Sequence, residues 1–379
     1  GLYDKNFIST HTVGLEKFIP YLNGDKDGQP KNAEWAAQIT GVSAQTIINL
    51  ARRMAECRTM ISTAWSLQRS DHGEQPIWLT VILASLLGQI GLPGGGFGIG
   101  YGCENGIGNP VKIFNWPALS QGTNSVEEFI PVARIADMLL HPGTKFDYDG
   151  EKLSYPDIRL LYWAGGNPFH HHQDLNRLVD AFRQPECVIV NEIWWTATAR
   201  HADIVFPITT VLERNDLMMT KWEPMATPMH KAIEPVGESR NDYDVFSGLA
   251  QRLGFFEEFT EGRNEEEWLR HLWDQARQRA GQANFELPDF DTFWHEGPKE
   301  ILKAEDKTVL LEAYRKDPQN NPLATPSGKI EIFSDVIAGF GYDDCPGHPV
   351  WMEPFEWLGG KTVKKFPLHI ISNQPSTRL

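Results

Sequence analysis

Three short apolar runs near the middle of the chain dominate its hydrophobic pattern. They cover residues 157–164, 186–190 and 204–208, and none of them alternates regularly with polar positions. Uninterrupted runs of this length are typical of parallel strands that are buried on both faces of a sheet. Between the first two runs, residues 173–183 place apolar side chains at helical spacing. A strand, a turn, a helix and a strand in this order predict a right-handed βαβ unit.

Helical periodicity predicts a scaffold on both sides of these strands. Residues 32–56 predict a pair of helices, and Ser43 can cap the second one because its hydroxyl accepts from first-turn amides. Residues 238–254 and 264–280 predict two further helices, with Asn264 as the N-cap of the second. Strands and helices that alternate in this way predict the α/β class, with doubly wound, mostly parallel sheets and flanking helices.

A strand, a polar loop and a helix also follow one another in the first hundred residues. Residues 58–64 are a strand candidate, and the loop WSLQRSDHGEQP leads from them into the apolar segment 77–90. That segment falls short of the roughly 18 residues of a membrane-spanning helix, so we expect a buried helix. The glycine-rich residues 91–102 contain no GxGxxG, so we expect close backbone passage or a flexible connection there instead of a dinucleotide fingerprint.

Composition and charge narrow the classes of function. The 379 residues are 41% hydrophobic, enough for a sizeable core, and the formal net charge is -15. A negative charge of this size repels nucleic acid and anionic lipid, so neither a nucleic-acid partner nor a membrane-surface role is expected. Because no apolar segment is long enough to span a bilayer, membrane insertion is not expected either. The wide spacing of the cysteines counts against an iron–sulfur cluster or a zinc knuckle in this segment. The four cysteines are Cys57, Cys103, Cys187 and Cys345.

The turn after the first strand of the βαβ unit is the best candidate for ligand binding. It has the sequence GGNPFHHH, residues 165–172. In a doubly wound sheet, ligands lie beyond the carboxyl ends of the strands, where glycine turns let backbone amides approach a phosphate. The second strand ends in Asn191 and Glu192, and an acid there can accept from a ribose hydroxyl or a guanine edge. This pairing favours a nucleotide ligand.

The three consecutive histidines, residues 170–172, leave three interpretations open. Neighbouring residues of a helix point about 100° apart, so three in a row cannot all face one metal ion. Asp174 is the obvious carboxylate, and it could complete a metal site only with His170 or His171. The alternatives are a nucleotide-facing polar turn and a solvated helix start, of which the pattern favours the first.

Two other positions also carry alternatives. Asp203 precedes the third apolar run, where it either caps local amides or orients a ligand-binding loop. Trp65 and Arg69 are either a core indole and a surface guanidinium, or the lining of a site for a polyanionic ligand. The planar fork of donors on Arg is suited to the second role.

Six ordered motifs resemble one enzyme family. They are WSLQRSDHGEQP, LLGQIGLPGGGFG, YWAGGNPFHHHQDLNR, WWTATARHADIVFP with ERND following, TPSGKIEIFS and SNQPSTRL. They resemble the bis(molybdopterin guanine dinucleotide) S- and N-oxide reductases, which include dimethyl sulfoxide, trimethylamine N-oxide and biotin sulfoxide reductases. The resemblance implies a molybdenum-dependent oxidoreductase that reduces a small S-oxide or N-oxide by oxygen-atom transfer. It also implies an electron donor such as a c-type cytochrome or a soluble reductant.

The resemblance further implies a cofactor site. The cofactors are molybdenum and bis(molybdopterin guanine dinucleotide), with no iron–sulfur cluster in this segment. Trp65, Gln68 and Arg69 are expected near the pterin and the active-site funnel. The remaining residues of the expected site surround a guanosine or its diphosphate, support the loop that binds it, or lie at the start of the C-terminal domain. The expected cofactor-binding residues are Trp65, Gln68, Arg69, Gly166, Asn167, Pro168, His171, His172, Glu192, Asp203, Ser372, Asn373 and Arg378.

The resemblance also predicts a domain organisation within a longer enzyme. Residues 1–102 are expected to be the C-terminal part of one α/β cofactor-binding domain, and residues 103–365 a second α/β domain that binds the molybdopterin guanine dinucleotide. Residues 366–379 are expected to begin a β-barrel-like domain that clamps the cofactors. Since the serine ligand of molybdenum is expected upstream of Gly1, this segment should hold no catalytic residue and no metal ligand, and it should be inactive alone.

Two other functions and two compartments stay open at this stage. The chain could belong to a formate dehydrogenase or nitrate reductase type of molybdopterin oxidoreductase. As it stands it could also be a non-catalytic nucleotide-binding fragment. The family resemblance implies the periplasm, with the cytoplasm as the alternative.

Overall fold

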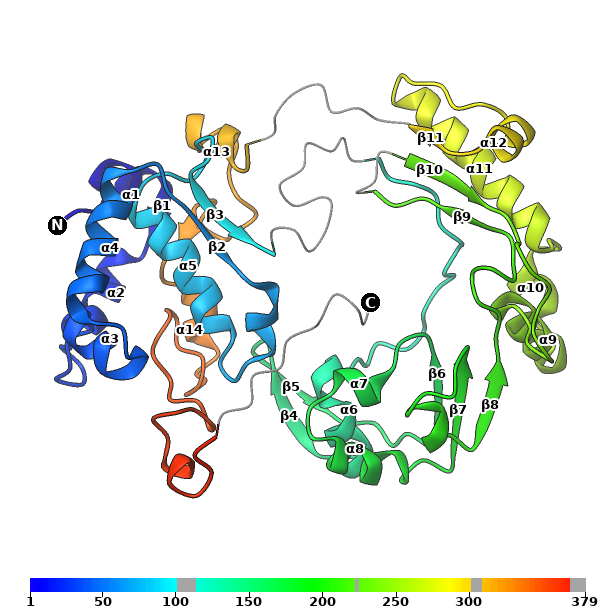
Figure 1. Ribbon diagram of the computed structural model, residues 1–379, viewed down its shortest axis with the longest axis horizontal. Helices are drawn as coiled ribbons and strands as arrows, with labels where there is room; N and C mark the ends of the chain where they lie inside the picture. Colours follow the sequence, from blue (N-terminus) through cyan, green and yellow to red (C-terminus); the bar gives the residue numbers. More distant parts are fainter. Residues whose placement is uncertain (101–113, 222–224, 301–308, 369–379) are drawn as a thin grey trace. The chain divides into compact units, whose positions relative to one another are not determined.

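The computed structural model of the protein describes residues 1–100, 114–221, 225–300 and 309–368. These residues form two compact units (Figure 1). Unit 1 contains the described parts of residues 1–110 and 306–379, coloured blue to cyan and orange to red. Unit 2 contains the described parts of residues 111–305, coloured green and yellow.

Unit 1 combines helices with two short pairs of parallel strands. Strand β2 (Met60–Thr63) pairs with β3 (Gly96–Ile99), and β1 (Thr12–Val13) pairs with β12 (Ile330–Glu331). Its helices are α1 (Lys5–His11), α2 (Leu15–Asn23), α3 (Ala33–Thr40), α4 (Ala44–Glu56), α5 (Glu74–Leu86), α13 (Glu312–Lys316) and α14 (Asp335–Gly339), with the 3-10 helices η1 (Trp65–Arg69) and η4 (Lys361–Lys364).

Helix α5 connects the two hydrophobic clusters of unit 1. Ala84 packs in one cluster with Tyr314, and Ile82 packs in the other with Ile332. Tyr314 and Ile332 come from the C-terminal part of the chain, so segments far apart in the sequence pack into the same two clusters. The stretch 103–365, which the sequence assigns to one domain, therefore contains residues of both units. The physical reason is the pairing of β12 with β1, which joins positions far apart in the sequence.

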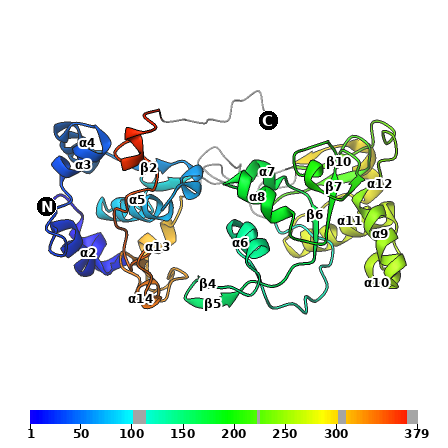
Figure 2. The ribbon, with the colours of Figure 1, turned by 90° about the horizontal axis from the view of Figure 1, so that it is seen from below.

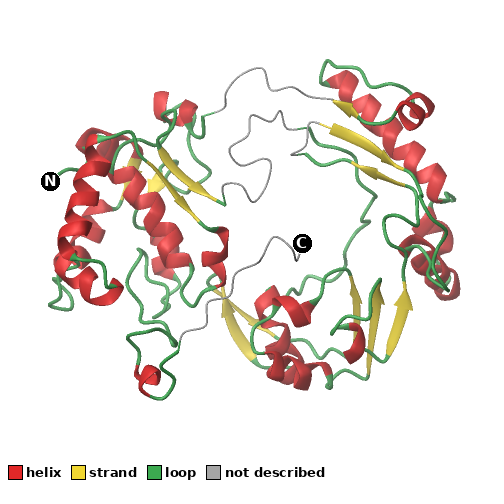
Figure 3. Ribbon diagram, in the orientation of Figure 1, coloured by secondary structure: helices red, strands yellow, loops and turns green. Residues whose placement is uncertain are grey.

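The parallel sheet of unit 2 confirms the predicted strand–helix–strand arrangement. Strands β6 (Leu160–Ala164), β7 (Cys187–Glu192) and β8 (Ile204–Pro207) lie side by side in this order (Figure 3). Helix α8 (Leu175–Phe182) connects the first two strands. Apolar side chains of α8 pack against β7 in one core cluster, since both elements are apolar where they meet. Among its members are Leu178, Ala181, Phe182, Val188 and Val190.

The rest of unit 2 contains antiparallel strands and a group of helices. The helices α9 to α12 gather on one side of the unit (Figure 2). Asn264 and Glu267 form a reciprocal capping box at the start of α11, which confirms the predicted N-cap. The elements are α6 (Ile135–Leu140), β4 (Lys145–Tyr148), β5 (Glu151–Ser154), β9 (Asp216–Met218), β10 (Met225–Met229), α9 (Asp242–Leu253), α10 (Phe256–Thr260), α11 (Glu265–Gln282), α12 (Phe290–Glu296) and β11 (Lys299–Glu300), with the 3-10 helices η2 (Val132–Arg134) and η3 (Ala199–His201).

The structure corrects three expectations. The predicted helix 173–183 is shorter, because Asp174 has a φ of 51° and caps α8 through its side chain, while α7 (Pro168–His171) forms a separate turn. Of the two alternatives for the glycine-rich segment 91–102, the flexible connection is wrong where strand β3 forms. Helix α5 is buried on part of its surface only, since Leu79 and Leu83 are exposed.

The C-terminal residues and the apolar segments were also subjects of prediction. The predicted strand of a C-terminal domain, residues 366–379, lies outside the described residues from residue 369 onward. Among the residues that the structure describes, no helix has the length and apolar character needed to cross a membrane.

Candidate functional site

The carboxyl edge of the β6–β7–β8 sheet brings together most of the predicted nucleotide-binding residues. In the parallel register, Ala164 faces Asn191 and Glu192 faces Pro207. The turn that follows β6 and the end of β7 therefore lie at the same edge of the sheet. Ligands of parallel α/β sheets bind at this edge.

The turn after β6 is built on two glycines in the left-handed region. Gly165 has a φ of 83° and Gly166 a φ of 78°, which side chains other than glycine rarely adopt. A Cβ at Gly165 would meet no atom within 4 Å. Within the described residues, the amide N–H groups of both glycines donate to no protein acceptor. The turn thus offers open space and free donors to an anionic group.

Asn167 and Pro168 fix the exit from this turn. The side-chain oxygen of Asn167 accepts a hydrogen bond from the hydroxyl of Thr198, which is fully buried. Because its oxygen is engaged, the amide nitrogen of Asn167 remains as a donor. Pro168 is buried and occupies the first position of α7. The sequence did not single out Thr198, and its only signal is its place in the polar TATA stretch.

The three histidines do not converge. His170 and His171 are exposed on α7, whereas His172 follows the helix and is half-buried. Burial lowers the pKa of His172 below its ordinary value, and the neighbouring His171 lowers it further. A neutral imidazole has one donor and one acceptor nitrogen, both suited to a nucleotide. In the described part of the chain, no group of three His, Cys, Asp or Glu side chains is arranged to hold a metal ion.

Glu192 shapes the loop that follows β7. One of its carboxylate oxygens accepts from the amide of Ile193 at 2.9 Å, and the other accepts from the hydroxyl of Thr196 at 2.9 Å. Each oxygen has two lone pairs, so each can accept one more hydrogen bond. The carboxylate is therefore held in place and still able to accept from a ligand.

Asp203 lies at the opposite edge of the sheet from these residues. Its carboxylate accepts from the amide of Val188 at 2.8 Å, and its own amide donates to the carbonyl of Val188 at 2.9 Å. Val188 is near the start of β7, so Asp203 anchors the far end of the loop that begins at Glu192. The structure therefore places Asp203 as a support of the loop and does not bring it to the carboxyl edge.

A buried polar chain at the end of β7 was not predicted from the sequence. Asn191 is 3% exposed; its oxygen accepts from the hydroxyl of Tyr162 at 2.9 Å, and its amide donates to Asp242 at 2.8 Å. Burial raises the pKa of Tyr162, and the charge of Asp242 raises it further, so the phenol stays a donor. The signal in the sequence was a polar residue at the end of an apolar strand, next to Glu192.

Trp65, Gln68 and Arg69 lie in unit 1, on the 3-10 helix η1 that follows β2. All three are exposed. In the described residues, neither the amide of Gln68 nor the guanidinium of Arg69 has a hydrogen-bond or ion-pair partner in the protein. A Cβ at Gly100 would come within 2.3 Å of the Trp65 ring, so glycine is required beside this indole. This confirms close backbone passage within the glycine-rich segment.

The predicted site residues thus fall into three sets. The first set lies on η1 in unit 1, and the second lies along the β6–β7–β8 sheet in unit 2. The third set, Ser372, Asn373 and Arg378, lies outside the described residues. The described sets share free hydrogen-bond donors at exposed positions, and such donors suit phosphate or other anionic groups.

Comparisons with curated proteins show relatives that align along the whole chain. Biotin sulfoxide reductase of Cereibacter sphaeroides is 49% identical over 380 residues. Dimethyl sulfoxide/trimethylamine N-oxide reductase of Rhodobacter capsulatus is 48% identical over 395 residues, and trimethylamine-N-oxide reductase of Haemophilus influenzae is 49% identical over 396 residues. Each alignment covers 100% of this chain and 51%, 47% and 48% of the respective relative. The chain therefore spans about half the length of these relatives.

A solved structure shares the fold, and a family-wide sequence pattern matches most of the chain. Acetylene hydratase from Pelobacter acetylenicus has a similar fold, with a TM-score of 0.58 and 20% sequence identity, over 97% of this chain and 50% of that one. Residues 3–252 match the sequence pattern of the family described as molybdopterin oxidoreductase. This match covers more than half of the chain, and we conclude that the chain belongs to the molybdopterin oxidoreductase family.

Proposed function

We propose that the protein to which this chain belongs is a molybdenum-dependent oxidoreductase that reduces S-oxides or N-oxides. The substrates are of the dimethyl sulfoxide, trimethylamine N-oxide or biotin sulfoxide type. The proposal depends on one observation, the 48–49% identity along the whole chain to reductases named for these compounds. A small S-oxide or N-oxide is the substrate class, and a c-type cytochrome or a soluble reductant is the electron donor.

The family implies a molybdenum–molybdopterin cofactor, and the described residues fit such a group. The cofactor is polyanionic, and the amides of Gly165 and Gly166 at the carboxyl edge of the sheet donate to no acceptor among the described residues. The unpaired guanidinium of Arg69 provides further donors. We extend the proposal to the bis(molybdopterin guanine dinucleotide) form of the cofactor, with no iron–sulfur cluster bound by this segment.

Each side chain has a defined task in this proposal. Gly166, Asn167 and Pro168 shape the turn that binds the diphosphate, since glycine lets the backbone approach phosphate closely. His171 and His172 border the guanosine, and Glu192 accepts from its donor edge. The polar chain through Asn191 holds the end of β7, and Asp203 holds the far end of the following loop.

In this proposal the residues of η1 bind a pterin. Trp65, Gln68 and Arg69 orient the pterin and exclude water from it. When bound, the cofactor supplies oxygen-atom transfer from the substrate, and two electrons and two protons from the donor then release that oxygen as water. The protein binds, orients and shields the reacting groups, as is general for cofactor enzymes.

The wider organisation belongs to the same proposal. For the full-length protein we propose doubly wound sheets, and Ser372, Asn373 and Arg378 as further contacts of the cofactor. We propose the periplasm as the compartment, as the family resemblance implies, with the cytoplasm as the alternative.

The decisive experiment uses the full-length enzyme. Molybdenum is measured by mass spectrometry, GMP is released from the cofactor by acid hydrolysis, and oxidation of dithionite-reduced viologen is followed with each of the three substrates. We expect molybdenum, GMP and turnover of at least one substrate. Protein without molybdenum would contradict the family cofactor, whereas molybdenum without GMP would contradict only the dinucleotide form.

Arg69 allows a sharper test of the cofactor site. Arg69→Ala should weaken cofactor retention by at least about tenfold, because a hydrogen bond to a charged group contributes about 1.5–3 kcal/mol. Arg52→Ala is the matched control, since Arg52 is also exposed and has no partner among the described residues of unit 1. The readout is the molybdenum and GMP content after dialysis. Equal retention in both variants would remove Arg69 from the proposal.

A further inference from the structure

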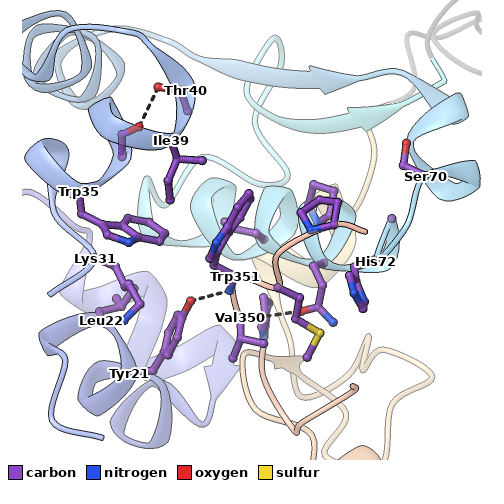
Figure 4. Close-up of a pocket in the computed structure, with 18 of the residues that line it drawn as sticks. Tyr21, Leu22, Lys31, Trp35, Ile39, Thr40, Ser70, His72, Val350 and Trp351 are labelled. Atoms are coloured by element: carbon purple, nitrogen blue, oxygen red, sulfur yellow. Dashed lines mark hydrogen bonds between the residues drawn. The ribbon is translucent and has the colours of Figure 1, made fainter. Parts of the chain in front are cut away.

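Unit 1 contains an apolar pocket that the proposed function does not use. The cavity has a volume of about 450 Å³. Its walls come from α2, α3, the loop at residues 70–73, the start of α5, and residues 349–354 near the end of the chain, which we name the strap (Figure 4). All of these elements belong to unit 1.

Three hydrogen bonds hold the strap in place. The amide of Trp351 donates to the hydroxyl oxygen of Tyr21 at 2.6 Å, and the amide of Val350 donates to the side-chain oxygen of Gln75 at 2.9 Å. Just beyond the strap, the amide of Phe355 donates to Asp71 at 2.9 Å. The first two of these bonds are drawn in Figure 4. The pocket is therefore formed in the folded chain, and a ligand need not order the strap.

The walls are suited to a flat ring system. The indoles of Trp35 and Trp351 lie edge to face, with ring centroids 6.3 Å apart and an interplanar angle of 84°. Ile39 and Leu79 add aliphatic surface from α3 and α5, and both line the cavity. Trp351 and Leu79 are 41% and 45% exposed, so their apolar faces are open to a ligand. Pockets for small molecules are mostly apolar and contain few polar groups.

The charges at the pocket are already paired within the protein. The ammonium of Lys31 donates to Asp27 at 2.6 Å and to the carbonyl of Gln29 at 2.6 Å, and it lies 4.6 Å from the ring centroid of Tyr21. The carboxylate of Asp71 accepts from Phe355. An ionic ligand would therefore lose its water without finding a free counter-charge from Lys31 or Asp71, which is costly.

The hydroxyl of Tyr21 is a polar group of the pocket that remains open to a ligand. The oxygen of Tyr21 accepts from Trp351, but its hydroxyl proton reaches no acceptor among the described residues. Burial raises the pKa of Tyr21, so the phenol keeps its proton at neutral pH. It can donate to one acceptor atom on a ligand.

We propose that this pocket binds a neutral, planar aromatic molecule of two or three rings that carries one hydrogen-bond acceptor. The rings lie against Trp35 and Trp351, and the acceptor receives the hydrogen bond from Tyr21. This site is separate from the proposed cofactor residues of unit 1, which lie on η1. Its ligand contacts the loop at residues 70–73, which directly follows η1 in the sequence.

A pair of fluorescent probes tests the chemical class. Prodan is a neutral naphthalene with a carbonyl acceptor, and 1-anilinonaphthalene-8-sulfonate is an anionic naphthalene. Each is titrated into the full-length protein, and energy transfer from tryptophan reports the bound probe. We expect saturable binding of one Prodan per chain and at least tenfold weaker binding of the sulfonate. Tighter binding of the sulfonate, or no saturable binding of Prodan, would overturn the proposal.

Substitutions locate the probe. Ala36→Trp places an indole inside the cavity and should abolish Prodan binding, whereas Gln38→Trp adds an indole on the same helix at an exposed position that does not line the cavity. Leu79→Trp fills the cavity from α5 and replaces the first variant if that one fails to fold. Equal Prodan binding by a folded filled variant and the Gln38→Trp control contradicts the site. A change of oligomeric state in a filled variant would identify an interface between copies instead, and would also overturn the proposal.

The hydrogen bond from Tyr21 has its own control. Tyr21→Phe should weaken Prodan binding about tenfold and shift the emission of the bound probe to shorter wavelength, because the carbonyl loses its donor. Binding of 2-dimethylaminonaphthalene, which lacks the carbonyl, should stay unchanged if the strap is intact. Equal loss of both probes would show that Tyr21 acts only by holding the strap, and would refute the assigned acceptor.

Discussion

Gly165 is the residue whose backbone bears most directly on the proposed nucleotide site. It has a positive φ and open space at its Cβ position, and so does Gly254 at the end of α9. Gly165→Ala and Gly254→Ala should each lower the free energy of unfolding by about 1 kcal/mol, because alanine is strained in the left-handed region. Only Gly165→Ala puts a methyl group where the phosphate would approach, so only this variant should lose GMP content. Urea unfolding and GMP release measure the two effects, and equal GMP loss would contradict the site.

His348 predicts how stability depends on pH. It is 3% exposed and packs near Phe18 and Tyr21, and burial is the largest cause that lowers its pKa. The unfolded chain then binds a proton more readily than the folded chain. The stability from this residue is therefore complete above the unfolded pKa of about 6.5 and is lost as the pH falls toward the lower folded pKa. We expect His348→Phe to reduce the loss of stability between about pH 7.5 and 5.5.

Urea unfolding at the two pH values measures this difference. His141→Phe is the control for the loss of an imidazole, because His141 is exposed. If His348→Phe loses as much stability on acidification as the unchanged protein, protonation of His348 does not contribute to acid unfolding.

Local sequence patterns predicted which residues lie at the candidate site better than they predicted which residues hydrogen-bond to one another. The GGNP turn was predicted correctly because glycine pairs and a proline restrict the backbone locally. The bond between Asn167 and Thr198 joins positions 31 apart, and the bond between Asn191 and Asp242 joins positions 51 apart. No local pattern records such contacts, because they depend on how the strands are brought together.

Helix caps allow a prediction at the scale of elements. Asn264 caps α11, which buries Trp268 and Trp273, whereas Asn32 caps α3, which buries no residue. Each Asn→Ala change removes the same kind of cap and costs about 1 kcal/mol of helix stability. We expect Asn264→Ala to lower the stability of unit 2, because the packing of α11 depends on the helix. Asn32→Ala should only fray α3.

Hydrogen exchange separates these outcomes. The first turn of each helix should exchange faster in its own variant, and amides of the β6–β7–β8 sheet should change only with Asn264→Ala. Unchanged exchange in that sheet would show that α11 can fray without loosening the unit.

Elements with strong local patterns were predicted, and elements defined by distant pairing were missed. The three strands of the parallel sheet are apolar runs, and α3, α4, α9 and α11 have helical spacing and caps. By contrast, β3 is glycine-rich, and its strand conformation comes from pairing with β2. Strands β1 and β12 have two residues each, so their pairing has no periodicity to reveal it.

At the scale of the whole molecule, the two units have separate hydrophobic cores. Tyr314 is 2% exposed in unit 1, and its hydroxyl donates to the carbonyl of His11. Phe293 is fully buried in unit 2 and stacks on Trp273 with ring centroids 3.6 Å apart. The sequence predicted two α/β domains but placed the segment around Tyr314 with the second one. Its contacts with the first residues of the chain place it in unit 1 instead.

This division leads to a prediction about cooperativity. Replacement of a buried aromatic residue by alanine costs about 3–5 kcal/mol. Tyr314→Ala should therefore increase hydrogen exchange in α1, α5 and β12, and Phe293→Ala should increase it in α11 and α12, each with little effect on the other unit. Exchange is measured by mass spectrometry of peptides from both units in the same sample, so each variant is the control for the other. If both variants loosened both units equally, the units would unfold as one cooperative body, and the contact-based division would have no counterpart in stability.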